Sequence, residues 1–494
     1  MNNIKKLAGQ TAIYGLSSIL GRLLNYLLTP LYTYSFVTEQ YGVYTELYAY
    51  TAFLVVLLTY GMETAYFRFT KSDYNPQDVY KTSLFSILAS TLVFFILGLT
   101  FADNIGSYLS KGSINLPYSL YVSWFVLIIG FDAISAIPFA KLRNENKALK
   151  FATIKLLGIA SNIAFNLFFI LWCPKIIQNE GHFLFKLVNG FYHPEYGIAY
   201  AFIANLISST LTLILLIPQF KLTGKFILPL WKKMIKYALP LLVLGFAGII
   251  NENIDRVLLK NLLPYSPEKN LSLMGIYGAC YKVSIIMTIF IQAFRYAAEP
   301  FFFSQLNNSN AKETYAKVFT YFAIVCSIIF LGVMLNIDWL IKFVGPEFRT
   351  GKSIIPILLL ANMFLGLFYN LSIWYKLTDK TIYGAYISII GALITLVLNY
   401  LWIPHYGYTG SAWATLVCYF SMFVLSYLLG QRYYPVKYNL IKVGAYMVSA
   451  IAVFVIVNYL GNTINLFLKN IFLILFIAII YLLERPKKVV ISRQ

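Results

Sequence analysis

The chain has 494 residues, of which 59% are hydrophobic and only 12% are charged. A soluble globular protein is typically about 45–50% apolar and about 25% charged, so this composition excludes a soluble enzyme and indicates a protein surrounded mostly by lipid. The net charge of +20 argues little for nucleic acid as a partner, because the Lys and Arg residues lie in short segments between apolar runs, as membrane topology requires.

Fourteen apolar segments are long enough to cross a bilayer, which takes about 20 mostly apolar residues. These predicted spans lie at 10–35, 42–67, 81–101, 117–139, 151–172, 197–218, 236–262, 274–303, 315–336, 354–375, 382–403, 410–430, 440–460 and 465–483. The first span is too long for a secretory signal and lacks a small-residue cleavage site, so we expect it to be retained. The sequence therefore predicts an all-α polytopic membrane protein with about 14 transmembrane helices.

The distribution of Lys and Arg between the spans predicts the orientation of the chain in the membrane. By count from the sequence, roughly 24 basic residues lie in the termini and in the loops on their side. Roughly 9 lie in the opposite loops, Lys260 among them. Because cytoplasmic loops carry the excess of positive charge, we expect both termini on the cytoplasmic side of a bacterial inner membrane.

The chain contains an internal repeat. The stretch YGVYTELYAY from Tyr41 resembles MGIYGACYKV from Met274, and a basic turn with the following span recurs as well. Three pairs of matching residues share an offset of 233: Gly42 with Gly275, Lys147 with Lys380, and Asn166 with Asn399. A shared offset over distant matches is the signature of a duplicated unit.

The repeat pairs spans 1 to 6 with spans 7 to 12, so both halves have the same orientation in the membrane. We expect two six-helix lobes that enclose a central cavity, with spans 13 and 14 outside the repeat. The predicted parts are an N-terminal lobe at 1–222, a basic cytoplasmic linker at 223–235, a C-terminal lobe at 236–431, and helices 13 and 14 with a basic tail at 432–494.

Twelve charged residues fall inside the predicted spans, where each costs at least about 2.5–3.5 kcal/mol at a helix centre unless it is paired or hydrated. They are the basic residues Arg22, Arg68, Lys155, Arg256, Lys282 and Arg295, and the acidic residues Glu46, Glu63, Asp132, Glu252, Asp255 and Glu299. Ten of them lie on spans 1, 2, 7 and 8, so we expect these four helices to face one water-accessible cavity. Asp132 and Lys155 are isolated on spans 4 and 5, where a structural role is the simpler interpretation.

Spacing predicts partners for some of these charges. Glu252 and Arg256, in the stretch NENIDRVLLK, are four residues apart, so they share a helix face and can form an ion pair. The same holds for Arg295 and Glu299. Such pairs either line a binding site or only neutralise each other, whereas Arg22 has no acidic neighbour and needs a partner across the bundle or an anionic substrate. Snorkelling to the membrane interface is an alternative for four residues near span ends: Glu46, Glu63, Arg68 and Lys282.

No catalytic or metal-binding motif is visible in the sequence. The four cysteines are scattered without a CxxC pair, and we expect them to be small buried hydrophobes. The three histidines show no metal-ligand spacing. Since no P-loop, GxSxG or HExxH is present either, we expect neither an enzyme nor a bound metal or organic cofactor.

The chain resembles the MOP exporter superfamily, and within it the Wzx-type flippases of polysaccharide biosynthesis. The residues that carry the resemblance are NIDRVLL at 253–259, MGIYGACYKV at 274–283, Glu299 with Pro300, the first-half counterpart YGVYTELYAY, and the basic turn KLRNENKALK at 141–150. The resemblance covers most of the chain, and its motifs identify the superfamily better than the substrate.

The resemblance implies a flippase that moves an undecaprenyl-pyrophosphate-linked oligosaccharide from the cytoplasmic to the outer leaflet by alternating access. The partners it implies are this glycan lipid, membrane lipids and glycan assembly proteins. We expect Arg22, Arg256 and Arg295 to contact the pyrophosphate, because arginine presents a fork of charged donors. We expect four acidic residues to position these arginines or to bind a coupling proton or sodium ion: Glu252, Asp255, Glu299 and Glu63. Weaker candidates are Glu46, Arg68 and Lys282.

Three alternatives stay open at this point. An ion-coupled multidrug and toxin exporter of the same superfamily would be expected to have a more acidic cavity. A lipid II flippase is a close relative that the sequence does not separate from a glycan flippase. A membrane glycosyltransferase or glycan polymerase would usually need a large external loop or an acidic catalytic motif, and neither is visible.

Overall fold

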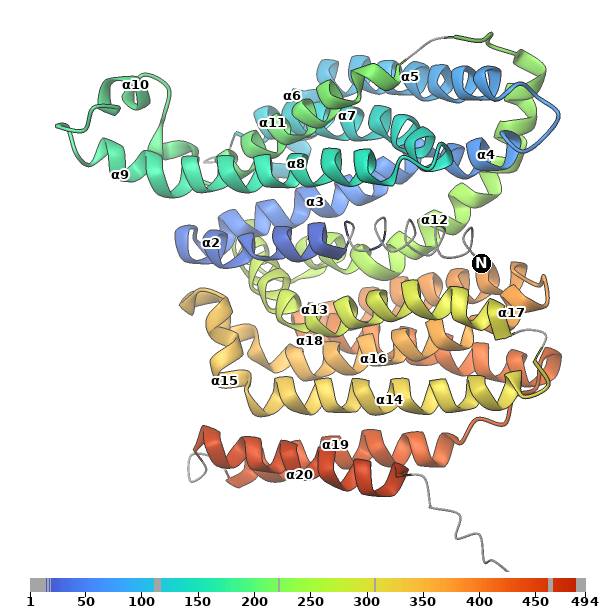
Figure 1. The fold of residues 1–494 in the computed structure, drawn as a ribbon. Helices are drawn as coiled ribbons and strands as arrows, with labels where there is room; N and C mark the ends of the chain where they lie inside the picture. The colour runs from blue at the N-terminus through green and yellow to red at the C-terminus, as the bar shows by residue number, and fades with distance from the viewer. Residues whose placement is uncertain are drawn as a thin grey trace, which may run out of the picture. The chain divides into compact units, whose positions relative to one another are not determined.

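The computed structural model describes residues 15, 17, 19–110, 117–220, 223–305, 308–460 and 465–485. Within these residues the secondary structure is helical and contains no strand (Figure 1). The helices up to residue 220 are α2 (Leu28–Ser35), α3 (Thr38–Thr59), α4 (Met62–Phe69), α5 (Pro76–Thr100), α6 (Ala102–Ser110), α7 (Tyr118–Asn144), α8 (Ala148–Leu167), α9 (Cys173–Ile177), α10 (Phe185–Asn189) and α11 (Ala199–Leu216).

The later helices are α12 (Leu228–Leu262), α13 (Pro267–Gln305), α14 (Ala311–Leu335), α15 (Ile337–Leu340), α16 (Ile355–Leu371), α17 (Ile373–Leu377), α18 (Ile382–Tyr433), α19 (Leu440–Leu460) and α20 (Leu466–Glu484). A π-helical turn, η1 (Phe168–Trp172), continues α8 into α9. The 3-10 segments are η2 (Pro194–Tyr196), η3 (Ile217–Gln219), η4 (Ile341–Phe343) and η5 (Pro346–Ile354).

Contacts divide the chain into two compact units. Unit 1 comprises Met1–Lys282, Val344–Gly351 and Ala385–Cys418, and unit 2 comprises Val283–Phe343, Lys352–Gly384 and Tyr419–Gln494. In unit 1, α7 packs against α5 and α11, and α12 packs against α3, α4 and α5; in unit 2, α14 packs against α16, α19 and α20 (Figure 1). Since these bounds differ from the predicted lobes at 1–222 and 236–431, the division into lobes stays a prediction.

Twelve helices of the described residues are long and apolar enough to cross a membrane, which confirms a polytopic membrane protein. The long helix α18 contains two of the predicted spans, 382–403 and 410–430, which meet at a kink where Gly407 has φ 59°. The predicted first span, 10–35, lies partly outside the described residues. The number of fourteen spans therefore stays a prediction.

The internal repeat is visible in local geometry. Asn146 and Asp379, which are related by the offset of 233, both have left-handed backbones with φ of 56° and 55°. Each of these residues ends the basic turn that precedes a long helix. The buried amides of Asn166 and Asn399 each donate to the carbonyl four residues earlier at 2.8 Å. The two halves thus repeat the same turn and the same side-chain contact.

The crossing of α3 with the start of α13, inside unit 1, follows the repeat as well. A Cβ at Gly42 would overlap the carbonyl oxygen of Leu271, and a Cβ at Gly275 would overlap that of Thr38. Leu271 and Thr38 are themselves 233 residues apart. The glycine of each half therefore faces the carbonyl at the repeat-equivalent position in the other half. Nearby, the hydroxyls of Thr38 and Ser272 are 2.8 Å apart and share a hydrogen bond. Small residues let helix backbones approach this closely inside a membrane.

We expect Gly275→Ala to lower the melting temperature of the purified protein. The added methyl group has no room at the crossing, and overpacking of this kind costs about 1–3 kcal/mol. Gly248→Ala on α12 is the matched control, since a Cβ there meets nothing within 4 Å. Alanine is also the better helix former, so the control should keep or raise the melting temperature. Equal melting temperatures for the two variants would contradict the proposed close crossing.

Candidate functional site

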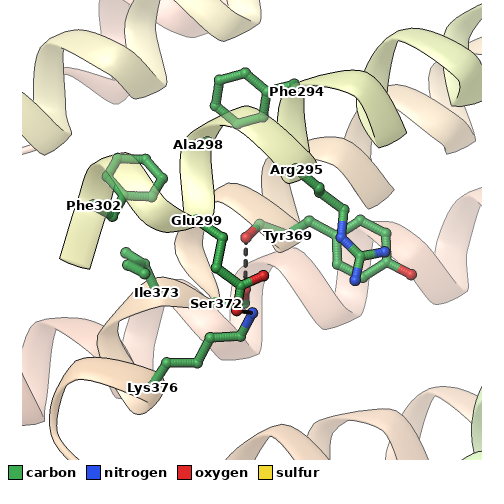
Figure 2. A pocket seen from close by; sticks show the side chains of 9 residues that line it. All are labelled: Phe294, Arg295, Ala298, Glu299, Phe302, Tyr369, Ser372, Ile373 and Lys376. Atoms are coloured by element: carbon green, nitrogen blue, oxygen red, sulfur yellow. Dashed lines mark hydrogen bonds and ion pairs between the residues drawn. The ribbon is translucent and has the colours of Figure 1, made fainter. Parts of the chain in front are cut away.

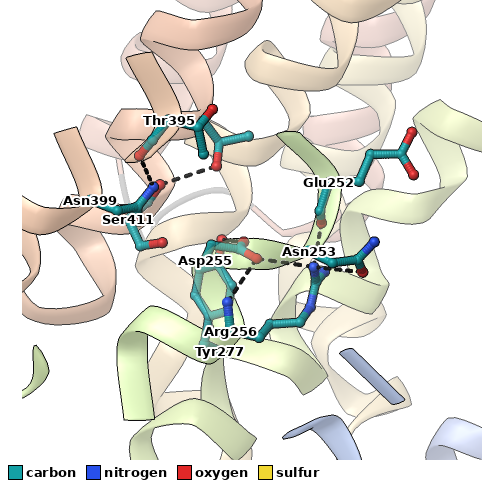
Figure 3. Close-up of polar contacts among 9 residues, drawn as sticks. Glu252, Asn253, Asp255, Arg256, Tyr277, Thr395, Asn399 and Ser411 are labelled. Carbon is teal, nitrogen blue, oxygen red and sulfur yellow. Dashed lines mark hydrogen bonds and ion pairs between the residues drawn. The ribbon is translucent and has the colours of Figure 1, made fainter. Parts of the chain in front are cut away.

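The C-terminal part of α12 holds a charge cluster around Arg256. The guanidinium Nη1 of Arg256 lies 3.1 Å from Oδ1 of Asp255 and 3.2 Å from Oδ1 of Asn253, and it also donates to the backbone carbonyl of Glu252. The hydroxyl of Tyr277 donates to the other carboxylate oxygen of Asp255 at 2.7 Å. Figure 3 shows these contacts converging on one side of the helix.

This cluster differs from the expected pairing of Glu252 with Arg256. The Glu252 carboxylate points away from the guanidinium in Figure 3, and the ion pair is made with Asp255 instead. The Arg256 side chain is only 12% exposed, and its guanidinium lies 4.5 Å from the centre of the Tyr281 ring. A neighbouring acid, a backbone carbonyl and an aromatic face therefore hold Arg256 in one orientation.

Two further basic residues of unit 1, Lys282 and Arg22, lie near other positively charged side chains. Lys282 on α13 is within electrostatic range of Arg256, and it makes no ion pair with any residue that the structure describes. Arg22 is exposed, lies within range of Lys155, and likewise has no ion pair inside the described part of the chain. Clustered like charges favour a bound anion, because the anion relieves their mutual repulsion.

A buried ion pair joins α3 to α12 at Glu46, for which the sequence left both a cavity position and snorkelling to the interface open. Nζ of Lys260 lies 2.7 Å from Oε1 of Glu46, with side chains that are 3% and 0% exposed. Tyr118 donates to the other oxygen of Glu46 at 3.3 Å, and Lys260 also donates to the carbonyl of Leu109. The prediction that Lys260 lies in an outer loop is therefore wrong. Glu46 does not snorkel to the interface; it is fully buried.

The remaining candidates of unit 1 bind neighbours from other helices. Glu63 on α4 forms an ion pair with Arg143 at the end of α7, and the Arg68 guanidinium lies 4.3 Å from the Tyr237 ring centre. Asp132 accepts a hydrogen bond from Ser209 at 2.9 Å, as the structural interpretation of this residue suggested. Arg143 belongs to the basic turn at 141–150, and its ion pair with Glu63 joins α7 to α4.

Unit 2 contains the pair Arg295 and Glu299, and the structure separates their side chains. Glu299 accepts from Nζ of Lys376 on α17 at 2.8 Å, while the Arg295 guanidinium lies 3.9 Å from the centre of the Tyr369 ring on α16. Figure 2 shows the two groups around a cavity of about 20 Å³, room for about one water molecule. Four-residue spacing permits the expected pair, but partners on neighbouring helices replace it.

Uncharged polar side chains beside the α12 cluster escaped the sequence analysis. Asn251 donates to the carbonyl of Ser388 at 3.1 Å, and its own oxygen accepts from Thr395 and Cys418. Asn399 and Ser411, drawn in Figure 3, each keep a buried oxygen without a hydrogen-bond partner in the described residues. The one feature of the sequence that pointed to these residues is that amide and hydroxyl side chains stand within apolar runs. The described residues contain no group of three His, Cys, Asp or Glu suited to a metal.

The cysteines conform to the prediction. Cys173, Cys280, Cys326 and Cys418 are all buried and free. They therefore pack as small hydrophobic side chains.

We expect Lys260→Met to lower the melting temperature strongly, because removing one member of a buried pair leaves the other charge uncompensated at a cost of about 3–5 kcal/mol. The double variant Glu46→Gln with Lys260→Met should recover much of this loss, since the neutral amide still accepts from Tyr118. Thermal denaturation followed by intrinsic fluorescence measures both effects. A single variant as stable as the parent would show that this pair contributes nothing.

Comparison with known proteins places this arrangement in a family. A family model described as polysaccharide biosynthesis protein matches residues 7–307. No curated protein matches the chain. A structure of the lipid II flippase MurJ in an inward closed conformation is similar over 95% of this chain and 98% of that one, with 14% identity and a TM-score of 0.71.

Two drug transporters share the fold. An inward-facing multidrug resistance MATE transporter of the MOP superfamily matches 88% of this chain and 98% of its own, with 14% identity and a TM-score of 0.61. The MATE multidrug transporter DinF-BH, solved as a complex, matches 87% and 95%, with 17% identity and a TM-score of 0.59. The family match covers more than half of the chain, and the fold agrees. The chain belongs to the polysaccharide biosynthesis protein family, and its fold is that of the flippase and the multidrug transporters to which it is similar.

Proposed function

We propose that this protein is a flippase that moves an undecaprenyl-pyrophosphate-linked oligosaccharide from the cytoplasmic to the outer leaflet by alternating access. The family supports a role in polysaccharide biosynthesis. The structural similarity to a lipid II flippase supports a substrate made of a lipid carrier and a glycan. In this proposal both termini are cytoplasmic, and the membrane is the bacterial inner membrane.

The observation that carries the proposal is the orientation of Arg256. Its guanidinium is fixed by Asp255 at 3.1 Å and by the Tyr281 ring, and Tyr277 in turn fixes Asp255. A guanidinium that is already held in one orientation, in a site of low dielectric constant, binds a pyrophosphate at little cost in side-chain entropy. In this scheme Asp255 positions the arginine, and Lys282 within range adds a second positive charge.

The other candidates have secondary roles in the scheme. Arg22 and Arg295, which have no ion pair in the described residues, are further anion contacts. Glu252, Glu299 and Glu63 position basic groups or bind the coupling ion, a proton or sodium, and no organic cofactor takes part. Glycan assembly proteins of the same membrane are the expected partners. Transport rather than catalysis is the function, so the protein is not an enzyme in this proposal.

A multidrug exporter is the competing function, and the fold admits it. Because Asp255 neutralises Arg256, these two residues and Lys282 together carry one net positive charge, which would disfavour a cationic drug. This sign of charge favours a phosphate-bearing substrate. A lipid II flippase would share the pyrophosphate site and differ only in the glycan.

We expect Arg256→Ala to abolish surface polysaccharide in a complementation assay while the protein is still expressed and inserted. Arg256→Lys should restore only part of the export, because lysine keeps the charge and loses the fork. Lys150→Ala, at the exposed start of α8, is the matched control and should export at the parental level. Full export by Arg256→Ala would remove this residue from the substrate site.

Deletion of the gene tests the direction of transport. We expect the lipid-linked glycan to accumulate on the cytoplasmic face, measured by its protection from an enzyme that labels glycans from outside the cell. Resistance to cationic dyes should not change. Normal surface glycan combined with dye sensitivity would overturn the proposal in favour of drug export.

A further inference from the structure

An apolar pocket of about 600 Å³ lies in unit 1, away from the charge cluster on α12. It is formed by the end of α3, the first half of α5 and the start of α12, and it includes Leu57, Ala89, Leu228, Trp231 and Leu239. Its volume falls in the range of small-molecule sites, about 300–1,000 Å³. No part of the proposed transport cycle uses this pocket.

The wall of the pocket suits hydrocarbon. The polar groups at its base satisfy one another, since Nε1 of Trp231 donates to the Ser86 hydroxyl at 2.7 Å and this hydroxyl lies 2.6 Å from that of Tyr60. Large apolar side chains at its rim are exposed, including Leu57 at 46% and Leu228 at 51%. In helices that cross a membrane, exposed apolar side chains of this kind face lipid.

The pocket has the length of one leaflet. Its lining on α12 extends from Leu228 to Leu242, which is about 21 Å along a helix that rises 1.5 Å per residue. One leaflet is about 20–22 Å thick including its headgroups, of which about 15 Å is hydrocarbon. A single acyl chain therefore fits along the pocket from the headgroup level towards the bilayer centre.

Positive charge lies near the end of the pocket where α5 and α12 begin. The segment before α12 is tied to α5 there, since Asp78 accepts from the backbone of Lys225 at 2.6 Å and Lys81 donates to the carbonyl of Gly224 at 2.9 Å. The Lys81 amino group also lies 5.8 Å from the centre of the Phe85 ring in the pocket wall. Lys232 is exposed and follows Trp231 directly. Lys81 thus lies beside the pocket wall, and the exposed Lys232 lies next to a residue that lines the pocket.

We infer that this pocket binds an anionic phospholipid of the surrounding membrane, with one acyl chain in the pocket and the phosphate between Lys81 and Lys232. The charge bias of the loops predicts the cytoplasmic leaflet for this end, which is the leaflet where anionic lipids attract basic segments. The bound lipid fixes the start of α12 against α5. The inference is independent of the substrate that the protein transports.

Native mass spectrometry of the purified full-length protein tests the site, with phosphatidylglycerol and phosphatidylethanolamine of identical acyl chains as probes. We expect phosphatidylglycerol to bind about 25-fold more tightly, since each of the two lysines near the lipid phosphate adds roughly a factor of five. Lys232→Gln should remove much of this preference and leave phosphatidylethanolamine binding unchanged. Lys150→Gln, on a helix outside the pocket, should keep the preference.

A second variant tests the pocket itself. Ala89→Trp fills it and should remove one bound lipid of either type, whereas Leu92→Trp, on an exposed part of α5 outside the pocket, should not. If the parent protein bound phosphatidylglycerol and phosphatidylethanolamine with equal affinity, the inference would be overturned. It would also be overturned if Leu92→Trp lost the bound lipid as Ala89→Trp does. Undecaprenyl phosphate that displaces phosphatidylglycerol and is itself lost in Ala89→Trp would also overturn it, because the site would then hold the carrier of the substrate.

Discussion

The ion pair between Glu46 and Lys260 shows the constraint on which this structure depends. An unpaired charge in a helix that crosses a bilayer costs several kilocalories per mole, so each buried charge needs a partner. Glu46 on α3 and Lys260 on α12 lie 214 positions apart in the sequence, and both are almost fully buried. Because neither tolerates the absence of the other, the pair fixes α12 against α3.

The repeat supplies a second fixed point on α3, this time against α13. Gly42 and Gly275 each face a carbonyl of the other half, so α3 and the start of α13 cross at backbone distance. A helix that is locked by a close crossing and by a buried ion pair moves only as part of a rigid body. Two such contacts therefore lie within unit 1, and both involve α3.

The fold follows from the sequence because its signals are local. Apolar segments of bilayer length predicted the long helices, and the repeat predicted the equivalent turns at Asn146 and Asp379. Charge partners were less predictable. Four-residue spacing suggested that Arg295 binds Glu299, yet Lys376 from another helix binds Glu299. Lys260 ends an apolar run and so looked like a loop residue, since a sequence pattern carries no information about a partner across the bundle.

The contrast between Lys260 and Arg256 separates structure from function on one helix. They are four residues apart on α12 and share a face. Lys260 binds the carboxylate of Glu46 and the carbonyl of Leu109, and its side chain is 3% exposed. The contacts of its amino group are therefore structural. Arg256 is held by Asp255, its neighbour in sequence, and by the Tyr281 ring. Its contacts orient the guanidinium without joining α12 to a distant acidic residue. Under the proposed function, an anionic substrate would therefore contact Arg256 rather than Lys260, with Lys282 also in range.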